Sequence, residues 1–159
     1  MRIIVTFVLA GILLPASPLQ AQTSEEKELR RIEAETARLE QQNDVALAKF
    51  LADDWVCVGP RGLSKQEFIE TVKFLKYKET HVFKYSEQEG ISPYIEKKNL
   101  TVHVFGDTAV VTYIKKYRQS LDVTKFFDED DTDIFTRDAS GWHLRLTKIS
   151  PVHTQTASN

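Results

Sequence analysis

The sequence contains a single cysteine, Cys57, so no disulfide can form within the chain. A domain without a disulfide must draw its stability from packing. Cys57 lies in the apolar run Trp55 to Val58, which holds no histidine or basic residue that would lower the pKa of a thiol. We therefore expect a small buried side chain at this position rather than a reactive nucleophile.

An excess of basic residues is also missing, because 21 Lys and Arg face 23 Asp and Glu. A mildly acidic chain without a basic stripe is a poor partner for nucleic acid. The sequence has no P-loop, dinucleotide-binding fingerprint, nucleophile–base pair or Cys/His metal spacing, so we expect no cofactor. The acidic run 128–133 lacks the glycine of a calcium-binding loop, so we expect no metal site, and we expect Asp128, Glu129 and Asp130 to form a solvated acidic edge instead.

Long hydrophobic runs are absent as well. The longest, Ile3 to Leu14, is too short for a bilayer, which takes about 20 residues. It follows the short, positively charged segment Met1-Arg2 and precedes prolines and small residues up to Ala21, an order typical of a secretory signal peptide. An uncleaved anchor or a misassigned start is the alternative, and Leu19 is a poor match at its place before the cleavage site.

These features predict three segments. Residues 1–21 are a signal peptide, residues 22–152 form one folded domain, and residues 153–159 are a flexible polar tail. The protein is then exported, either periplasmic or secreted, and has no membrane span after cleavage.

Helical periodicity fills the first part of the domain. A capping box at Thr23-x-x-Glu26 opens a helix of about 20 residues, and a second box at Ser64-x-x-Glu67 opens a helix that ends near Leu75. Between them lies a short helix over 45–51. The apolar stripe of the first helix is Leu29, Ile32, Thr36 and Leu39, and its Glu and Arg residues form a solvated outer face.

The period then changes from helical to two-residue alternation, which indicates strands. The predicted strands are Trp55–Val58, His81–Tyr85, Tyr94–Phe105, Thr108–Gln119, Phe126–Arg137 and Trp142–Ser150, with a turn over 120–125. Helices followed by hairpins predict an α+β fold with helices on one face of an antiparallel sheet.

The two hairpins allow the register to be predicted. A loop at Gly106-Asp107 pairs Phe105 with Thr108 and, further along, Val102 with Val111 and Leu100 with Tyr113; His103 then faces outward. The loop over 138–141 pairs Phe135 with Leu144, Asp133 with Leu146 and Asp131 with Lys148. The apolar Trp142, Leu144 and Leu146 mark the inner face, so Asp131, Asp133 and Lys148 point inward unless a bulge reverses them.

An inward carboxylate beside an apolar pocket has a raised pKa, which suits a general acid or base. Asp133 opposite Leu146 is the catalytic candidate, whereas Asp131 and Lys148 form a structural ion pair that also contacts ligand. Trp55, Tyr113 and Tyr117 are expected to line the pocket, with plain core packing as the alternative for these aromatic residues.

Several of these segments also carry a family resemblance. They are Phe50–Gly62 (FLADDWVCVGPRG), Ser64–Phe68 (SKQEF), Phe105–Val111 (FGDTAVV) and Gly141–Pro151. The chain resembles the nuclear-transport-factor-2-like (NTF2-like) superfamily, closest to its SnoaL-like and ketosteroid-isomerase-like branches. The resemblance implies a cone-shaped roll of about three helices wrapped by a strongly curved antiparallel sheet, with a pocket at the open end. It also implies a homodimer formed through the sheet.

The sequence departs from the catalytic patterns of those relatives. Gly59 stands where ketosteroid isomerases have a carboxylate, and no tyrosine occurs between Thr23 and Asn43, where they have a hydroxyl donor. Leu146 and Lys148 stand where many relatives have His-x-His. Isomerase chemistry needs both a base and an oxyanion donor, so direct transfer of that activity is rejected.

Three hypotheses follow, because this fold hosts enzymes, binding domains and assembly modules. The first is an exported domain that binds a small apolar molecule. The second is an isomerase, cyclase or hydratase that uses Asp133 as acid or base. The third is a homodimerisation module without catalysis.

Overall fold

The structure is a computed structural model that describes residues 23–60, 62–81, 94–118 and 127–152. The predicted signal peptide, the turn over 120–125, the tail and most of the predicted strand 81–85 lie outside these residues. The elements in chain order are α1 (Ser24–Gln41), the 3-10 helix η1 (Val45–Phe50), β1 (Leu51–Val58), β2 (Leu63–Ser64), α2 (Lys65–His81), β3 (Tyr94–Phe105), β4 (Thr108–Arg118), β5 (Phe127–Asp138) and β6 (Gly141–Pro151).

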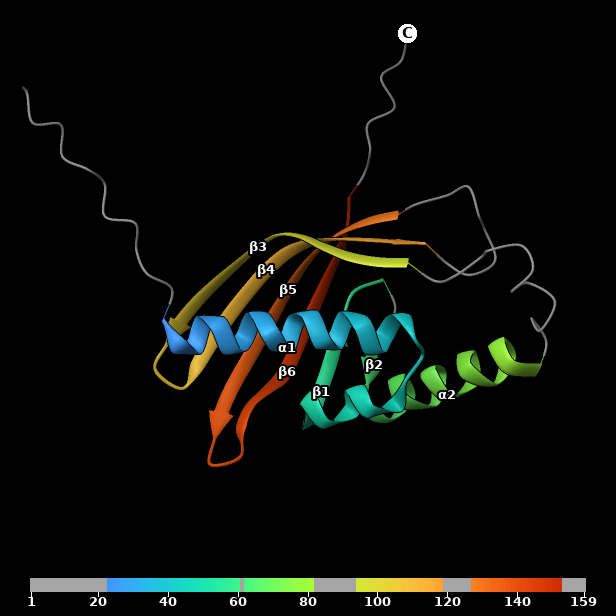
Figure 1. The fold of residues 1–159 in the computed structure, drawn as a ribbon, viewed down its shortest axis with the longest axis horizontal. Helices are drawn as coiled ribbons and strands as arrows, with labels where there is room; N and C mark the ends of the chain where they lie inside the picture. The colour runs from blue at the N-terminus through green and yellow to red at the C-terminus, as the bar shows by residue number, and fades with distance from the viewer. Residues whose placement is uncertain (1–22, 61, 82–93, 119–126, 153–159) are drawn as a thin grey trace, which may run out of the picture.

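The strands form one curved six-stranded sheet in the order β2-β1-β6-β5-β4-β3. Helix α1 lies across the concave side of strands β3 to β6, and α2 extends beside β1 and β2 (Figure 1). The α+β architecture and the curved sheet predicted from the sequence are confirmed. The sheet is mixed rather than wholly antiparallel, because β1 pairs with β6 in parallel. These two strands are far apart in sequence, so no hairpin fixes their relative direction.

Both predicted capping boxes are present. Thr23 Oγ1 accepts a hydrogen bond from the Glu26 amide at 3.2 Å, and the Ser64 amide donates to Glu67 Oε2 at 2.8 Å. Helix α2 continues to His81, so the predicted end near Leu75 and the strand placement of His81 are wrong. Strand β1 begins at Leu51, earlier than predicted.

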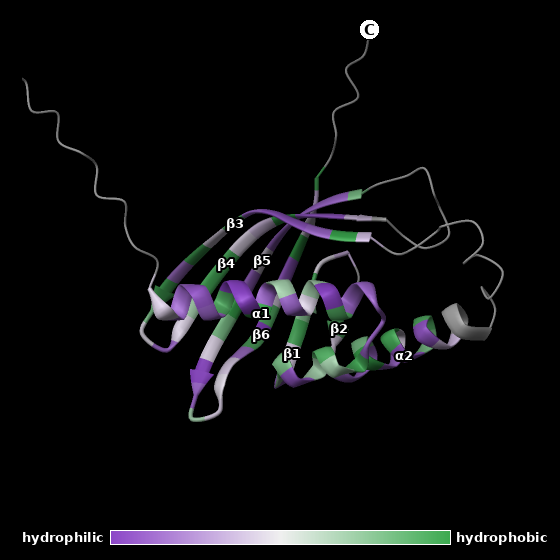
Figure 2. Ribbon diagram, viewed as in Figure 1, coloured by the Kyte–Doolittle hydropathy of each residue, from purple (hydrophilic) through white to green (hydrophobic). Residues whose placement is uncertain are grey.

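The core lies between α1 and the concave face of the sheet. Most of the α1 surface visible in Figure 2 is hydrophilic, and its apolar residues Leu29, Ile32 and Leu39 are buried. They pack into one cluster with inward residues from the strands, including Val102, Ala109, Val111, Phe135, Trp142 and Leu144. The predicted inner faces of both hairpins are therefore confirmed near their turns.

A bulge in β3 changes the register away from its turn. Thr101 pairs with Thr112 as predicted, but Lys98 pairs with Ile114, so Asn99 and Leu100 together face Tyr113. Asn99 adopts a left-handed conformation with φ of 55°. The predicted pair of Leu100 with Tyr113 is lost in this irregularity. Because the extra residue reverses the faces, Lys97 turns inward beyond the bulge.

A second bulge lies in β6, where Phe135 pairs with Leu144 but Ile134 pairs with Leu146. Arg145 is the extra residue. Thr147 then faces Asp133, and Ile149 faces Asp131. The predicted pairs of Asp133 with Leu146 and Asp131 with Lys148 are wrong, because the bulge turns Lys148 to the exposed face.

Candidate functional site

A cavity of about 110 Å³ lies between the helices and the concave face of the sheet. Its apolar wall comes from η1, β1, β2, α2 and β6, and its polar wall comes from α1 and strands β3 to β6. The apolar and thiol residues are Leu47, Leu51, Trp55, Cys57, Leu63, Phe68, Leu144 and Ile149. The polar residues are Thr36, Glu40, Lys97, Tyr113, Lys115, Asp131, Asp133 and Thr147.

One chain of polar contacts runs from α1 across three strands. Lys97 Nζ forms an ion pair with Glu33 Oε2 and lies 4.0 Å from Asp133 Oδ2. The same ammonium lies 4.3 Å from the centre of the Tyr113 ring. The Tyr113 hydroxyl donates to Asp133 Oδ2 at 2.7 Å. Glu33 and Asp133 are each only 1% exposed, so these charges depend on one another for stabilisation.

A second chain of polar contacts lies beside the first and runs from α1 to the same sheet. Glu40 follows Glu33 by two helical turns and so shares its face of α1. Lys115 Nζ binds Glu40 Oε1 at 2.7 Å, and Lys115 lies directly across from Lys97 in the sheet. Asp131, two residues from Asp133 on β5, lines the cavity beside Lys115. Together, the two chains of polar contacts contain four carboxyl groups and two ammonium groups.

Burial raises the pKa of two of these carboxyl groups. Burial raises the pKa of Glu33 to about 8, although Lys97 opposes the shift. Burial likewise raises the pKa of Asp131 to about 7, against the opposing charge of Lys115. Desolvation and the neighbouring Asp133 carboxylate raise the pKa of Tyr113 well above its ordinary value, which keeps its hydroxyl a donor.

Three carboxylate oxygens in this region have no hydrogen-bond partner among the described residues. They are Asp131 Oδ1, Asp133 Oδ1 and Glu33 Oε1. Asp131 and Asp133 line the cavity, whereas Glu33 lies behind Lys97. A buried polar atom without a partner is costly, so these oxygens mark the place where a bound molecule would gain most.

No known family model and no curated protein matches the sequence. Solved structures do match in fold. An NTF2-like protein with a cystatin-like fold from Novosphingobium aromaticivorans superposes with a TM-score of 0.65, at 16% identity over 84% of this chain and 85% of that one. The chain has the NTF2-like fold.

Two further structures with the NTF2-like fold carry proposed activities. A proposed dehydratase from Streptomyces avermitilis gives a TM-score of 0.63 at 20% identity, covering 79% of this chain and 94% of that one. A proposed ketosteroid isomerase from Parabacteroides distasonis gives a TM-score of 0.58 at 14% identity, covering 87% of this chain and 95% of that one. Identities this low establish the fold alone, and one fold hosts many functions.

Within the NTF2-like fold, four of the six residues expected at the site line one cavity. They are Trp55, Tyr113, Asp131 and Asp133. Trp55 Nε1 donates to Thr147 Oγ1 at 3.3 Å, which fixes the indole in the wall. Tyr117 is not among the lining residues and stacks on Phe127 at 5.4 Å between ring centres. Lys148 is exposed on the other face of the sheet, so its expected place in the pocket is wrong.

Sequence reasoning missed Glu33, Glu40, Lys97 and Lys115. Glu33 and Glu40 follow Leu29 by four and eleven positions, so they belong to the same helical stripe. That spacing was a usable signal. The inward turn of Lys97 depends on the β3 bulge, which the sequence marks only by Asn99, a residue that tolerates left-handed conformations.

Among the described residues, no group of three His, Cys, Asp or Glu side chains is arranged to hold a metal ion. The carboxyl groups are instead distributed along the two chains of polar contacts, around Lys97 and Lys115. The polar groups that line the cavity are carboxyl groups, ammonium groups, one phenol and two threonine hydroxyls, beside the Cys57 thiol.

Proposed function

We propose that this domain binds a small organic molecule in the cavity, with Asp131 as its polar anchor. The observation that carries the proposal is the Asp131 carboxyl group, which is 1% exposed, lines the cavity and leaves Oδ1 without a partner among the described residues. The facing wall is aromatic and aliphatic, from Trp55, Phe68 and Ile149. Apolar walls with a few placed polar groups are typical of ligand pockets.

The size of the cavity limits the enclosed part of the ligand. A cavity of about 150 Å³ holds benzene, and this one measures about 110 Å³. The enclosed group is therefore a small molecule or one end of a larger one.

The test uses a substitution that fills the cavity and a matched one that does not. Cys57→Leu adds volume to the lining, whereas Val56→Leu adds it on the exposed face of the same strand. In an NMR fragment screen of residues 22–159, we expect binders that shift the Trp55 indole signal and are lost in Cys57→Leu but kept in Val56→Leu. Binders that respond equally to both variants, or none that shift Trp55, would contradict the proposal. Thermal melts confirm that each variant folds.

A second candidate function is acid–base catalysis, and the pKa of Asp131 near 7 favours it. The sequence pointed to Asp133, but its Oδ2 accepts the Tyr113 hydroxyl and lies near Lys97, so Asp131 is the better base. Deuterium incorporation from solvent into butanone, followed by NMR, tests proton abstraction. Loss in Asp131→Asn with retention in the exposed neighbour Asp130→Asn supports this function, and equal rates exclude it.

Ketosteroid isomerase activity is not proposed. A side chain at Gly59 would place its Cβ 3.1 Å from Ile149 Cβ, so a carboxylate there would require β6 to move. Helix α1 contains no tyrosine. The tyrosine that lines the cavity is Tyr113 on β4, and its hydroxyl already donates to Asp133.

Export and dimerisation remain part of the proposal. The signal-peptide pattern of residues 1–21 supports export, and N-terminal sequencing of the secreted or periplasmic protein tests it.

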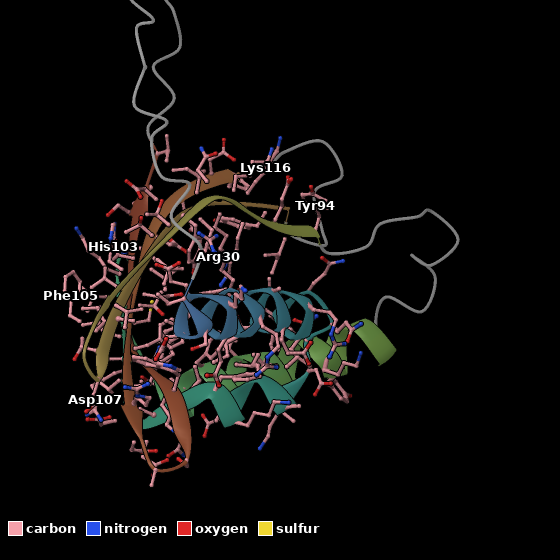
Figure 3. All side chains as sticks on the ribbon, turned by 60° about the vertical axis from the view of Figure 1, so that its left-hand side comes forward. Arg30, Tyr94, His103, Phe105, Asp107 and Lys116 are labelled. Carbon is pink, nitrogen blue, oxygen red and sulfur yellow. The ribbon has the colours of Figure 1, made fainter. Side chains whose placement is uncertain are left out.

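Exposed Val56, Val58 and Phe105 on the sheet support a homodimer through that surface, and Figure 3 shows His103 and Phe105 projecting from the outer side of β3. Sedimentation equilibrium distinguishes a monomer from a dimer. No helix among the described residues is long and apolar enough to cross a membrane.

A further inference from the structure

The lining of the cavity holds two buried carboxylate oxygens without a partner among the described residues, whereas each of its nitrogen and phenol donor groups already has at least one acceptor. We infer that the ligand group held by Asp131 and Asp133 is a protonated amine, with its alkyl part against the aromatic wall. This inference rests on the proposed ligand-binding function and adds the chemical class of the ligand.

The nitrogen and phenol donor groups of the lining can be accounted for one by one. Lys97 Nζ contacts Glu33 and lies 3.5 Å from Thr36 Oγ1, and the Tyr113 hydroxyl donates to Asp133. The Trp55 indole donates to Thr147. Lys115 binds Glu40 and lies in the field of the Asp131 carboxyl group. A ligand that only accepts hydrogen bonds would have to share these donor groups with the acceptors that they already bind.

The acceptors are free by comparison. Asp131 Oδ1 and Asp133 Oδ1 have no partner among the described residues. In the part of the chain that the structure describes, the buried donors without a partner are Arg30 Nε and Trp142 Nε1, and both belong to residues outside the cavity lining. Arg30 instead donates from Nη1 to the Leu100 carbonyl at 2.9 Å, holding α1 against β3.

The charges of the lining favour the same class of ligand. Three carboxyl groups, Glu40, Asp131 and Asp133, face two ammonium groups, Lys97 and Lys115. Glu33 adds a further carboxyl group directly behind Lys97. A cationic ligand would favour the ionised forms of these carboxyl groups, whereas a carboxylate ligand would be repelled by them.

The positions of the two aspartate carboxyl groups give the orientation of the ligand in the cavity. Asp131 and Asp133 are alternate residues on β5 and project to the same face. Across the sheet they face Ile149 and Thr147, and the indole of Trp55 is fixed on Thr147. An ammonium group between the two carboxyl groups would therefore leave its alkyl chain beside the apolar wall.

The test compares n-butylamine, 1-butanol and butyrate, which share one alkyl chain and differ in the end group. Binding to residues 22–159 at pH 7 is measured by NMR titration of the cavity signals. We expect the amine to bind at least tenfold more tightly than the alcohol, a difference of about 1.4 kcal/mol, and butyrate to bind most weakly. Asp131→Asn should weaken amine binding about tenfold and change alcohol binding by less than about twofold.

Asp130→Asn is the matched control, because it removes a carboxylate from the exposed face of the same strand. It should leave amine binding unchanged. Binding of butanol at the cavity with no preference for the amine, or an Asp130→Asn effect equal to that of Asp131→Asn, would overturn the inference and leave the proposed function standing. If none of the three probes binds at the cavity, both fail.

Discussion

Lys97 is the cation on which the buried carboxyl groups Glu33 and Asp133 depend, so its removal is the most informative perturbation. The Lys97 side chain is 9% exposed, and the two carboxylate side chains are 1% and 2% exposed. Substitution by Met keeps the length and apolar stem of the side chain but deletes the charge. At least one buried carboxyl group then lacks a counter-ion.

The expected loss in the free energy of unfolding depends on whether that carboxyl group stays ionised or takes up a proton. Leaving a buried charge without its partner costs about 3–5 kcal/mol. Taking up a proton is the alternative, and for a group that titrates near pH 4 when unfolded this costs about 4 kcal/mol at pH 7. We therefore expect Lys97→Met to lower the free energy of unfolding by about 3–4 kcal/mol at pH 7. The loss should shrink to about 1–2 kcal/mol at pH 5, where protonation is easier.

Urea denaturation followed by tryptophan fluorescence measures this difference. Lys98→Met is the control, because Lys98 is largely exposed and pairs with Glu96 at the surface, where a salt bridge is worth at most about 1 kcal/mol. The double variant Lys97→Met/Asp133→Asn should recover part of the loss, since it removes charges of both signs. A loss below about 1 kcal/mol at pH 7, or one independent of pH, would refute the role assigned to Lys97.

Two further predictions concern ionisation and thiol chemistry. The pKa values of Glu33 (about 8) and Asp131 (about 7) lie above the ordinary values of 4.5 and 3.8, so their stabilising contribution is complete at low pH and is lost as pH rises through the folded values. The free energy of unfolding should therefore fall between pH 5 and pH 8, and less steeply in Glu33→Gln; a parallel slope in that variant would contradict this. Burial also raises the pKa of Cys57 to about 11, so a thiol reagent should label it only as the protein unfolds, and rapid labelling of the native protein would argue against the packing described.

The sequence predicted the features that depend on local rules. The capping boxes at Thr23 and Ser64 and the register next to each hairpin turn follow from short-range hydrogen bonding and side-chain alternation, and the structure bears them out. Tyr113 and Asp133 were placed inward for the same reason.

The two bulges explain what sequence reasoning could not place. Each inserts one residue far from its turn, at Asn99 and Arg145, and alternation alone gives no sign of the insertion. The first brings Lys97 to the inner face, and the second sends Lys148 to the outer face. The polar set of the site therefore depends on long-range strand pairing.

Titration of the Asp131 side-chain carboxyl by carbon NMR tests the proposed function most directly, because that group is its polar anchor. Residues 22–159 with labelled aspartate, assigned with Asp131→Asn, provide the signal. We expect a midpoint near pH 7 in the free protein and a lower midpoint with saturating n-butylamine, since a bound cation favours the carboxylate. A midpoint near the ordinary value of 3.8, unchanged by the amine, would show that Asp131 is not a desolvated, unpartnered carboxyl group facing a ligand site.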